Sequence, residues 1–113
     1  MTTLTVAVHG PYSLDSGTID SVVTGTSPGV YVLADAASNV ARRVGRSDMD
    51  VRARLKTYVG KYHRFWFAYA GSPKEAFEKE CHLWHDLKPA DNIIHPDRPS
   101  GCGWRCPVCP IFN

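Results

Sequence analysis

Apolar and polar residues along the chain follow patterns that predict short strands separated by helices. Val30 to Leu33 is rich in β-branched and aromatic residues, which favours a strand after the turn at Ser27-Pro28-Gly29. Residues 40–44 fit the second arm of a hairpin that ends at Gly45. The run from Phe65 to Ala70 is continuously apolar, as in a central strand that is covered on both faces.

Two helices are predicted from their start signals. Ser47 and Asp50 stand three residues apart, like a capping box, before an apolar stripe that should form a helix to about Tyr58. Residues 72–75 combine a serine cap, a proline at the first helical position and a glutamate three residues after the cap. They predict a second helix over residues 73–88.

The first 27 residues form an extension to these elements. Leu4, Val6 and Val8 alternate with polar or small residues and predict an edge strand that Gly10-Pro11 breaks, and residues 18–23 fit one helical turn. The order strand, strand, helix, strand, helix then predicts an α+β fold with a small three-stranded β-sheet flanked by helices. The chain divides into an extension, a domain and an irregular Cys-rich tail: 1–27, 28–95 and 96–113.

Length and composition restrict the class of protein. The chain has 113 residues, of which 43% are hydrophobic, so it suffices for one modest domain and not for a multidomain enzyme. Its apolar runs fall far short of the roughly 20 residues that a membrane span needs. Residues 1–10 lack the charged-then-apolar layout of a secretory signal. We therefore expect a cytoplasmic protein without a membrane partner.

The positive charge is concentrated in the middle of the chain. Residues 42–64 contain eight Lys or Arg and two Asp, a net charge of +6, whereas the rest of the chain is net negative. Such a cluster suits the phosphate backbone of DNA, and a solvated helix face explains the same charge equally well. On the first interpretation, Arg43, Arg46 and Lys56 are candidate substrate contacts.

Two charged residues fall on or beside apolar helix faces. At 100° per residue, Glu80 lies within the arc of Phe77 and Leu83, so its carboxylate must lose hydration and needs a partner. Arg54 borders the stripe of the first helix, one turn from Tyr58. A guanidinium and a carboxylate that face the sheet can together hold a phosphate and Mg²⁺. A buried Glu–Arg pair of purely structural value is the alternative.

The order of these features resembles a known family. Gly29-Val30-Tyr31 is followed, after eleven residues, by Arg43-Val44-Gly45, which resembles the paired Gly-Ile-Tyr and Tyr-Ile-Gly strands of the GIY-YIG nucleases. The resemblance continues through four single positions: Arg54, Tyr58, Glu80 and Asn92. It covers about residues 28–95 and is closest to the nuclease module of bacterial nucleotide-excision repair.

This resemblance implies a metal-dependent endonuclease that hydrolyses DNA phosphodiester bonds. Glu80 would ligate one Mg²⁺ or Mn²⁺, and Arg54 would hold the scissile phosphate. Tyr31 would relay the proton of the attacking water, for which its phenol needs a nearby cation. Tyr58 would orient water or phosphate, and Asn92 would anchor its loop or the nucleic acid.

One position departs from the family pattern, because Arg43 stands where the second motif begins with tyrosine. Either cleavage is reduced or lost, or Arg43 adds a phosphate contact. The alternative functions are a nucleic-acid-binding module without catalysis and a zinc-stabilised interaction domain with a vestigial pocket. A domain of this size has little surface for sequence readout, so we also expect a protein partner for targeting.

The tail carries most of the cysteines: Cys102, Cys106 and Cys109. In a cytosolic chain such a group indicates a metal site more than a disulfide framework. Structural Zn²⁺ suits thiolate ligands, and His95 is a candidate fourth ligand.

Two other arrangements of the tail remain open. Cys81 and His85 of the second helix could join the last two cysteines as zinc ligands. Alternatively, the thiols are free, in a tail held by apolar contacts of Trp104, Ile111 and Phe112. His82 and His85 fall on the polar side of the helix, where a surface pair is expected.

Overall fold

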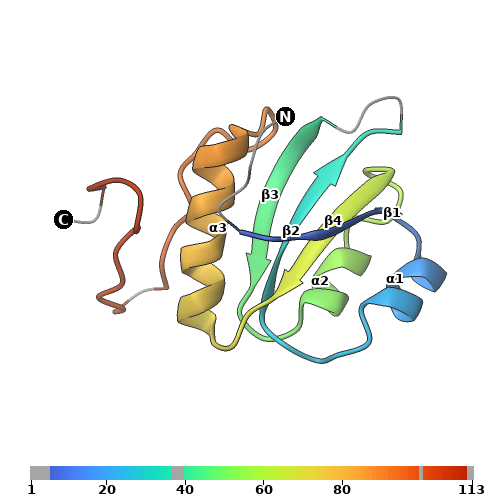
Figure 1. The fold of residues 1–113 in the computed structure, drawn as a ribbon, viewed down its shortest axis with the longest axis horizontal. Helices are drawn as coiled ribbons and strands as arrows, with labels where there is room; N and C mark the ends of the chain where they lie inside the picture. The colour runs from blue at the N-terminus through green and yellow to red at the C-terminus, as the bar shows by residue number, and fades with distance from the viewer. Residues whose placement is uncertain (1–5, 37–39, 100, 112–113) are drawn as a thin grey trace.

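The computed structural model describes residues 6–36, 40–99 and 101–111, which form an α+β fold. The elements are arranged along the chain as shown in Figure 1: β1 (His9–Ser13), α1 (Ser16–Val22), β2 (Gly29–Ala34), β3 (Ala41–Ser47), α2 (Val51–Lys56), β4 (Arg64–Tyr69) and α3 (Pro73–Leu87). The predicted strands at residues 30–33 and 65–70 and the predicted helix at 73–88 are confirmed to within one or two residues.

The sheet has four antiparallel strands in the order β1-β4-β2-β3, so the prediction of three strands is wrong. The predicted central strand β4 lies between β1 and β2. The additional strand is β1, and it crosses the dipeptide Gly10-Pro11 that was expected to break it. Of the predicted edge strand at residues 4–8, Leu4 lies outside the described residues, and residues 6–8 precede β1.

Gly10-Pro11 can lie within β1 because β1 is an outer strand, where a proline removes no hydrogen bond that a neighbour requires. The pairing with β4 shifts between His9 and Tyr12, which marks a bulge. Gly10 has a φ of +139°, and a Cβ there would lie 2.7 Å from the Phe65 carbonyl oxygen. Only glycine fits that position, so the residue that predicted a break instead permits the bulge.

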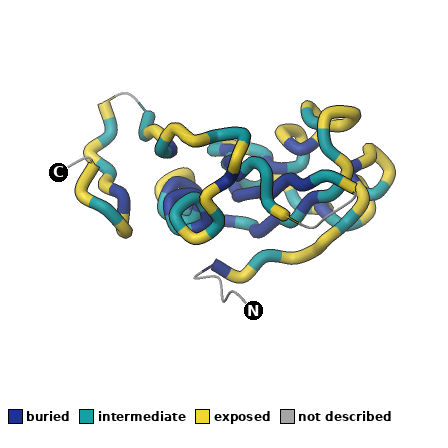
Figure 2. Tube along the Cα trace, turned by 90° about the horizontal axis from the view of Figure 1, so that it is seen from above, coloured by how far each residue is buried: buried dark blue, intermediate teal, exposed yellow. Residues whose placement is uncertain are grey.

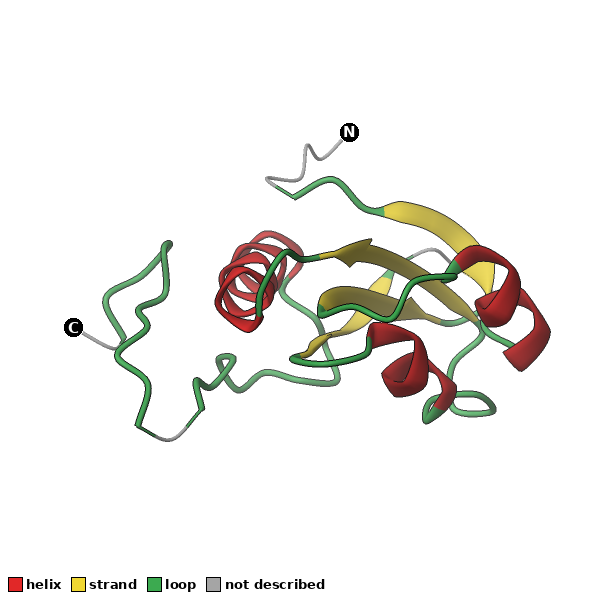
Figure 3. Cartoon of the chain, turned by 90° about the horizontal axis from the view of Figure 1, so that it is seen from below, coloured by secondary structure: helices red, strands yellow, loops and turns green. Residues whose placement is uncertain are grey.

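Helices cover both faces of the sheet (Figures 1 and 3). Tyr31 and Leu33 of β2 point to the face that α1 and α2 cover, and they join one apolar cluster with Ile19 of α1. Val30 and Val32 point the other way, into a second cluster that includes Leu83 of α3. Because side chains alternate along a strand, neighbouring residues of β2 face different helices.

The helix starts differ from each other in how well the sequence predicts them. Ser72 accepts a hydrogen bond from the Glu75 amide at 3.1 Å, so the predicted cap of α3 is confirmed. The cap of α2 is Asp50, whose carboxylate accepts from the Ala53 amide, while Ser47 accepts from the Asp50 amide. The helix α2 ends at Lys56, two residues earlier than predicted.

The tail lies on the side of α3 that faces away from the sheet, and it contains no helix or strand within residues 96–99 and 101–111 (Figure 1). Buried residues are concentrated in the sheet and in α3, whereas the tail is mostly exposed or half-buried (Figure 2). No helix of the described part of the chain is long and apolar enough to span a membrane.

Candidate functional site

A pocket of about 570 Å³ lies along β3, the outer strand opposite β1. We call it the β3 pocket. Its lining includes six residues that the sequence singled out, contributed by β2, β3, α2, α3 and the loop after α3: Tyr31, Arg43, Arg46, Arg54, Glu80 and Asn92. The fold therefore brings together residues from both faces of the sheet, because the pocket lies where those faces meet at its edge.

Tyr31 occupies space that a glycine provides. Tyr31 pairs with Gly45 across β2 and β3, and a Cβ on Gly45 would overlap the Tyr31 ring. Gly45 was expected to end its strand, which was wrong, since β3 continues to Ser47. The backbone of Gly45 supports the strand while its missing side chain admits the ring.

The Tyr31 hydroxyl donates to the Tyr58 hydroxyl at 3.3 Å, and the two ring centroids are 5.6 Å apart. Burial, together with the neighbouring Tyr58, raises the pKa of Tyr31 far above its ordinary value. The positive charge of Arg54 acts in the opposite direction and is outweighed. In this arrangement Tyr31 is a neutral phenol that can position water or phosphate, and its role as a proton relay stays a prediction.

Glu80 is buried, with 7% of its surface exposed, and it has the partner that its position on α3 required. That partner is Arg46, whose Nη1 lies 2.6 Å from Glu80 Oε1. The Nε atom of Arg46 also donates to Asp48 at 2.9 Å, so one guanidinium joins two carboxylates. Burial raises the pKa of Glu80, and its bond to Arg46 lowers it only in part.

The remaining cations of the pocket are not paired in this way. Arg54 is exposed on α2, and its guanidinium makes no hydrogen bond or ion pair within the described residues. Arg43 donates to the Tyr62 hydroxyl at 3.2 Å and lies 5.7 Å from the centre of the Tyr58 ring. No carboxylate of the described chain is within ion-pair distance of Arg43. The Arg54 guanidinium is thus available for an anion, whereas that of Arg43 is held by the Tyr62 hydroxyl and the Asp91 carbonyl and has no carboxylate partner.

Asn92 fixes the loop after α3 to the edge of the sheet. Its side-chain amide donates to the Val44 carbonyl at 2.7 Å and accepts from the Val44 amide at 3.1 Å. The Asp91 amide donates to the Arg42 carbonyl at 2.7 Å. Of the two roles expected for Asn92, the structure shows the anchoring of its loop.

Lys56 and Tyr58 lie outside the lining of the β3 pocket. Lys56 forms an ion pair with Asp20 of α1 at 2.7 Å. Tyr58 lines an adjoining recess of about 470 Å³ together with Arg43 and Tyr62. Its hydroxyl contact with Tyr31 connects this recess to the pocket.

A hydrogen-bonded group at the edge of this recess was not predicted from the sequence. Asp91 accepts from the Tyr62 hydroxyl at 2.7 Å and from Arg42 at 2.9 Å, and these bonds lower the pKa of Asp91. Tyr62 and Asp91 both lie in loops, where no periodic pattern marks them. The one available signal was the position of Asp91 next to Asn92.

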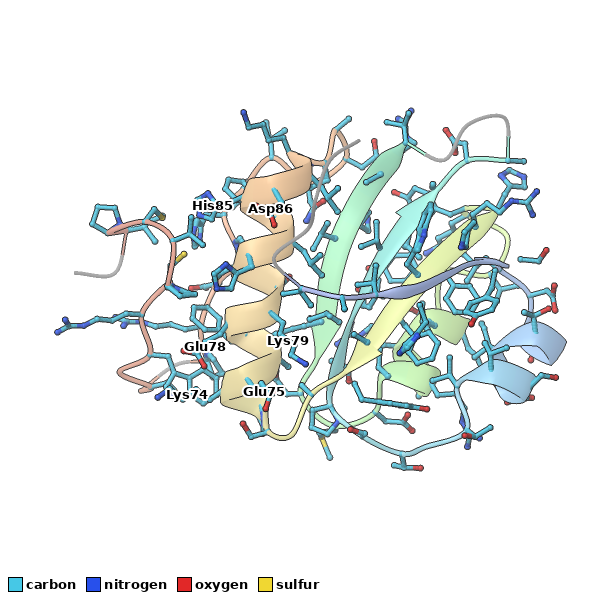
Figure 4. All side chains as sticks on the ribbon, in the orientation of Figure 1. Lys74, Glu75, Glu78, Lys79, His85 and Asp86 are labelled. Atoms are coloured by element: carbon cyan, nitrogen blue, oxygen red, sulfur yellow. The ribbon has the colours of Figure 1, made fainter. Side chains whose placement is uncertain are left out.

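A second group of chemically reactive side chains lies between α3 and the tail, and we call it the His–Cys cluster: His85, His95, Cys106 and Cys109. The donor atoms of the four residues all lie within 4.8 Å of one another. These residues can hold a metal ion such as zinc. His85 is half-buried and points from α3 toward the tail, so its assignment to a surface pair is wrong (Figure 4).

The observed set combines the two predicted ligand sets. Cys106 and Cys109 belong to both predicted sets, His95 to the first and His85 to the second. Cys102 and Cys81 are not members of the cluster. Cys81 is fully buried beside Cys106 and Phe77, and burial raises its pKa, so it remains a neutral thiol.

No protein family and no curated protein matches this sequence, and no solved structure matches the fold.

Proposed function

We propose that the β3 pocket is the active site of a GIY-YIG-type endonuclease, which hydrolyses DNA phosphodiester bonds with one Mg²⁺ or Mn²⁺. One observation carries the proposal. Four widely separated residues of the family pattern line a single pocket, namely Tyr31, Arg54, Glu80 and Asn92, and Arg43 joins them from the position of the second motif tyrosine. A pattern unrelated to the fold would have scattered these residues over the molecule.

The charges of the pocket support binding of a phosphate. Arg54 and Arg43 have no carboxylate partner within the described chain, so a phosphate group would supply the missing counter-charge. A guanidinium that holds a phosphate also stabilises the negative charge that grows during hydrolysis. Arg54 is placed for this role because it is exposed and lines the pocket at the sheet edge, where a DNA strand can reach it.

The arrangement of the two phenols supports a role in orienting the attacking water. Tyr31 and Tyr58 are joined hydroxyl to hydroxyl, with Tyr31 inside the pocket and Tyr58 at its boundary. Since the pKa of Tyr31 is raised, its hydroxyl orients a water molecule by hydrogen bonding. It removes a proton only when a cation bound nearby lowers that pKa.

Glu80 fits the hard cation that the family uses. Mg²⁺ favours one or two carboxylates, with waters and substrate phosphate as its other ligands. Glu80 provides one carboxylate at the pocket, and Asp48 lies on the other side of the same guanidinium. When bound, such an ion would neutralise phosphate charge and stabilise the leaving oxygen. Arg46 must then leave Glu80 and becomes a further phosphate contact.

The test is cleavage of end-labelled duplex DNA by the full-length protein with Mg²⁺, with Mn²⁺ and with chelator. Wild type should cleave with either ion and not with chelator. Glu80→Gln should bind the same DNA and cleave it at least roughly 100-fold more slowly, in line with loss of one transition-state contact. Undiminished cleavage by Glu80→Gln would defeat the assignment.

The second candidate is a nucleic-acid-binding module without catalysis, and two observations favour it. Arg46 occupies the Glu80 carboxylate, and Arg43 replaces the second motif tyrosine. Fluorescence anisotropy with the same duplex separates the candidates, because binding without cleavage under every ion condition supports the module. A protein partner that directs the domain to DNA is compatible with either candidate.

A further inference from the structure

The donor atoms of the His–Cys cluster are spaced as zinc ligands are. Cys106 Sγ lies 3.5 Å from His85 Nε2, and Cys109 Sγ lies 3.4 Å from His95 Nε2. With Zn–S of about 2.3 Å and Zn–N of about 2.0 to 2.1 Å, neighbouring S and N ligands of a tetrahedral ion are roughly 3.6 Å apart. No two donor atoms of the cluster are more than 4.8 Å apart, a limit that exceeds that edge by roughly an ångström.

Hydrogen bonds orient two of the donors toward the cluster. His95 Nδ1 lies 2.7 Å from the Pro96 carbonyl, and since a carbonyl only accepts, Nδ1 carries the hydrogen. The Nε2 atom, which faces Cys109, is then the unprotonated one. Cys106 Sγ accepts from the Val108 amide at 3.4 Å, a contact that favours the thiolate.

Apart from the cluster, the described tail is held mainly by a small apolar group against α3 and by a hydrogen bond from Arg98 to the Trp104 carbonyl at 2.7 Å. Within residues 96–99 and 101–111 only Pro96 and Cys106 are buried, and there is no helix or strand. Trp104 packs against Phe77 of α3 with ring centroids 5.8 Å apart. An apolar group of this size contributes little stabilisation for a tail of this length, and binding of a metal by its side chains would add to it.

The four ligands connect the tail to the segments that form the β3 pocket. His85 follows Glu80 by five residues on α3, and His95 follows Asn92 by three residues in the next loop. Cys106 and Cys109 come from the tail. We propose that Zn²⁺ binds the His–Cys cluster and fastens both the tail and the loop after α3 to α3. The ion is structural and separate from the catalytic ion proposed for Glu80.

The first experiment measures metal content and geometry of the full-length protein. Wild type purified with zinc should contain equimolar zinc, and replacement by Co²⁺ should give the intense visible bands of tetrahedral cobalt with a thiolate charge-transfer band. Cys109→Ala should lower zinc affinity by more than the roughly 10- to 100-fold that loss of a ligand's hydrogen-bond partner causes. Cys102→Ala is the matched control and should keep wild-type zinc. Equal zinc loss in both variants, or a six-coordinate cobalt spectrum, would overturn the proposal.

A ligand-preserving variant covers the case in which Cys109→Ala fails to fold. His85→Cys should still bind Co²⁺ and should strengthen the charge-transfer band, because a third thiolate then joins the ion. Hydrogen exchange of the same wild-type protein gives an independent readout. Amides of residues 91–95 and 104–109 should exchange faster after chelation, while those of β2 and β4 should not change. Unchanged exchange in both tail and loop would contradict the fastening role.

Discussion

The β3 pocket and the His–Cys cluster both depend on α3 but obtain their geometry in different ways. Glu80 and His85 lie roughly 140° apart around the helix, so one side chain meets the sheet and the other meets the tail. Strand pairing fixes the pocket, since Tyr31 and Gly45 are register partners and Asn92 is bonded to β3. The cluster is not fixed by strand pairing. Its four donors come from the end of a helix, a loop and an irregular tail.

The two sites also differ in their chemistry. The pocket contains carboxylate oxygens and guanidinium groups, which suit a hard cation and phosphate. The cluster contains thiols and imidazoles, which suit zinc. The donor atoms of the two sites therefore favour different kinds of ligand, although both sites share α3.

The largest expected effect concerns the unpaired cation of the pocket. Arg54→Ala should reduce single-turnover cleavage by roughly 100- to 1000-fold, because a phosphate contact of the transition state is lost. Its stability should stay within about 0.5 kcal/mol of wild type, since the side chain is exposed. Lys56→Ala is the matched control on the same helix, and it should cleave at nearly the wild-type rate. Equal losses in both variants would indicate an effect of overall charge.

The next effect concerns the paired cation. Arg46→Met should destabilise the protein by about 3 kcal/mol in urea unfolding, because Glu80 is left buried without its partner. The double variant Arg46→Met with Glu80→Met should recover to within about 1 kcal/mol of wild type, since well-packed apolar residues often replace a buried pair at little cost. Additive losses of the two substitutions would show that the pair is not coupled.

A smaller effect is expected at the glycine beneath Tyr31. Gly45→Ala should lower the free energy of unfolding by about 2 kcal/mol, because the added methyl overlaps the ring and forces it to move. Gly103→Ala is the control, since nothing lies within 4 Å of its added Cβ. A stable Gly45→Ala protein would mean that the Tyr31 ring is free to move.

The smallest effect is a pH dependence at the loop that Asn92 anchors. Bonds from Arg42 and Tyr62 lower the pKa of Asp91 below its ordinary value of 3.8, so the native state favours the ionised form. The stabilisation is complete above the ordinary pKa and is lost as pH falls through the lowered one. Asp91→Asn should therefore lose less stability than wild type on acidification below pH about 4. If the bonds from Arg42 and Tyr62 had no effect, the unfolding free energies of wild type and Asp91→Asn would change in parallel across this pH range.

Local signals allowed much of the fold to be predicted. The serine cap and proline of α3, and the apolar run of β4, are decided by nearby residues and were predicted correctly. The strand β1 was missed because a tertiary contact decides it, namely the approach of the Phe65 carbonyl to Gly10. The same holds for Gly45, because its place inside β3 depends on the Tyr31 ring of the neighbouring strand β2.

The residues that belong to the candidate site could be predicted from the sequence, but which of them pair with each other could not. Helical periodicity showed that Glu80 needed a partner, whereas the choice of Arg46 over Arg54 depends on how α3 packs against β3. In the tail, cysteine spacing indicated a metal but not the ligand set. His85 replaces Cys102 because α3 ends beside the tail, and no spacing in the sequence contains that information.

The separation of the two metal sites is the central claim, and Mn²⁺ titration of the zinc-loaded, ¹⁵N-labelled protein tests it most directly. Paramagnetic broadening should begin at amides around Glu80, such as those of Gly45 and Asp48, and Glu80→Gln should abolish it. The amides of Cys106 and Cys109 should broaden later than those around Glu80 and not at all in Glu80→Gln, because zinc already occupies their cluster. Broadening that begins at the tail, or that persists around the pocket in Glu80→Gln, would contradict the account.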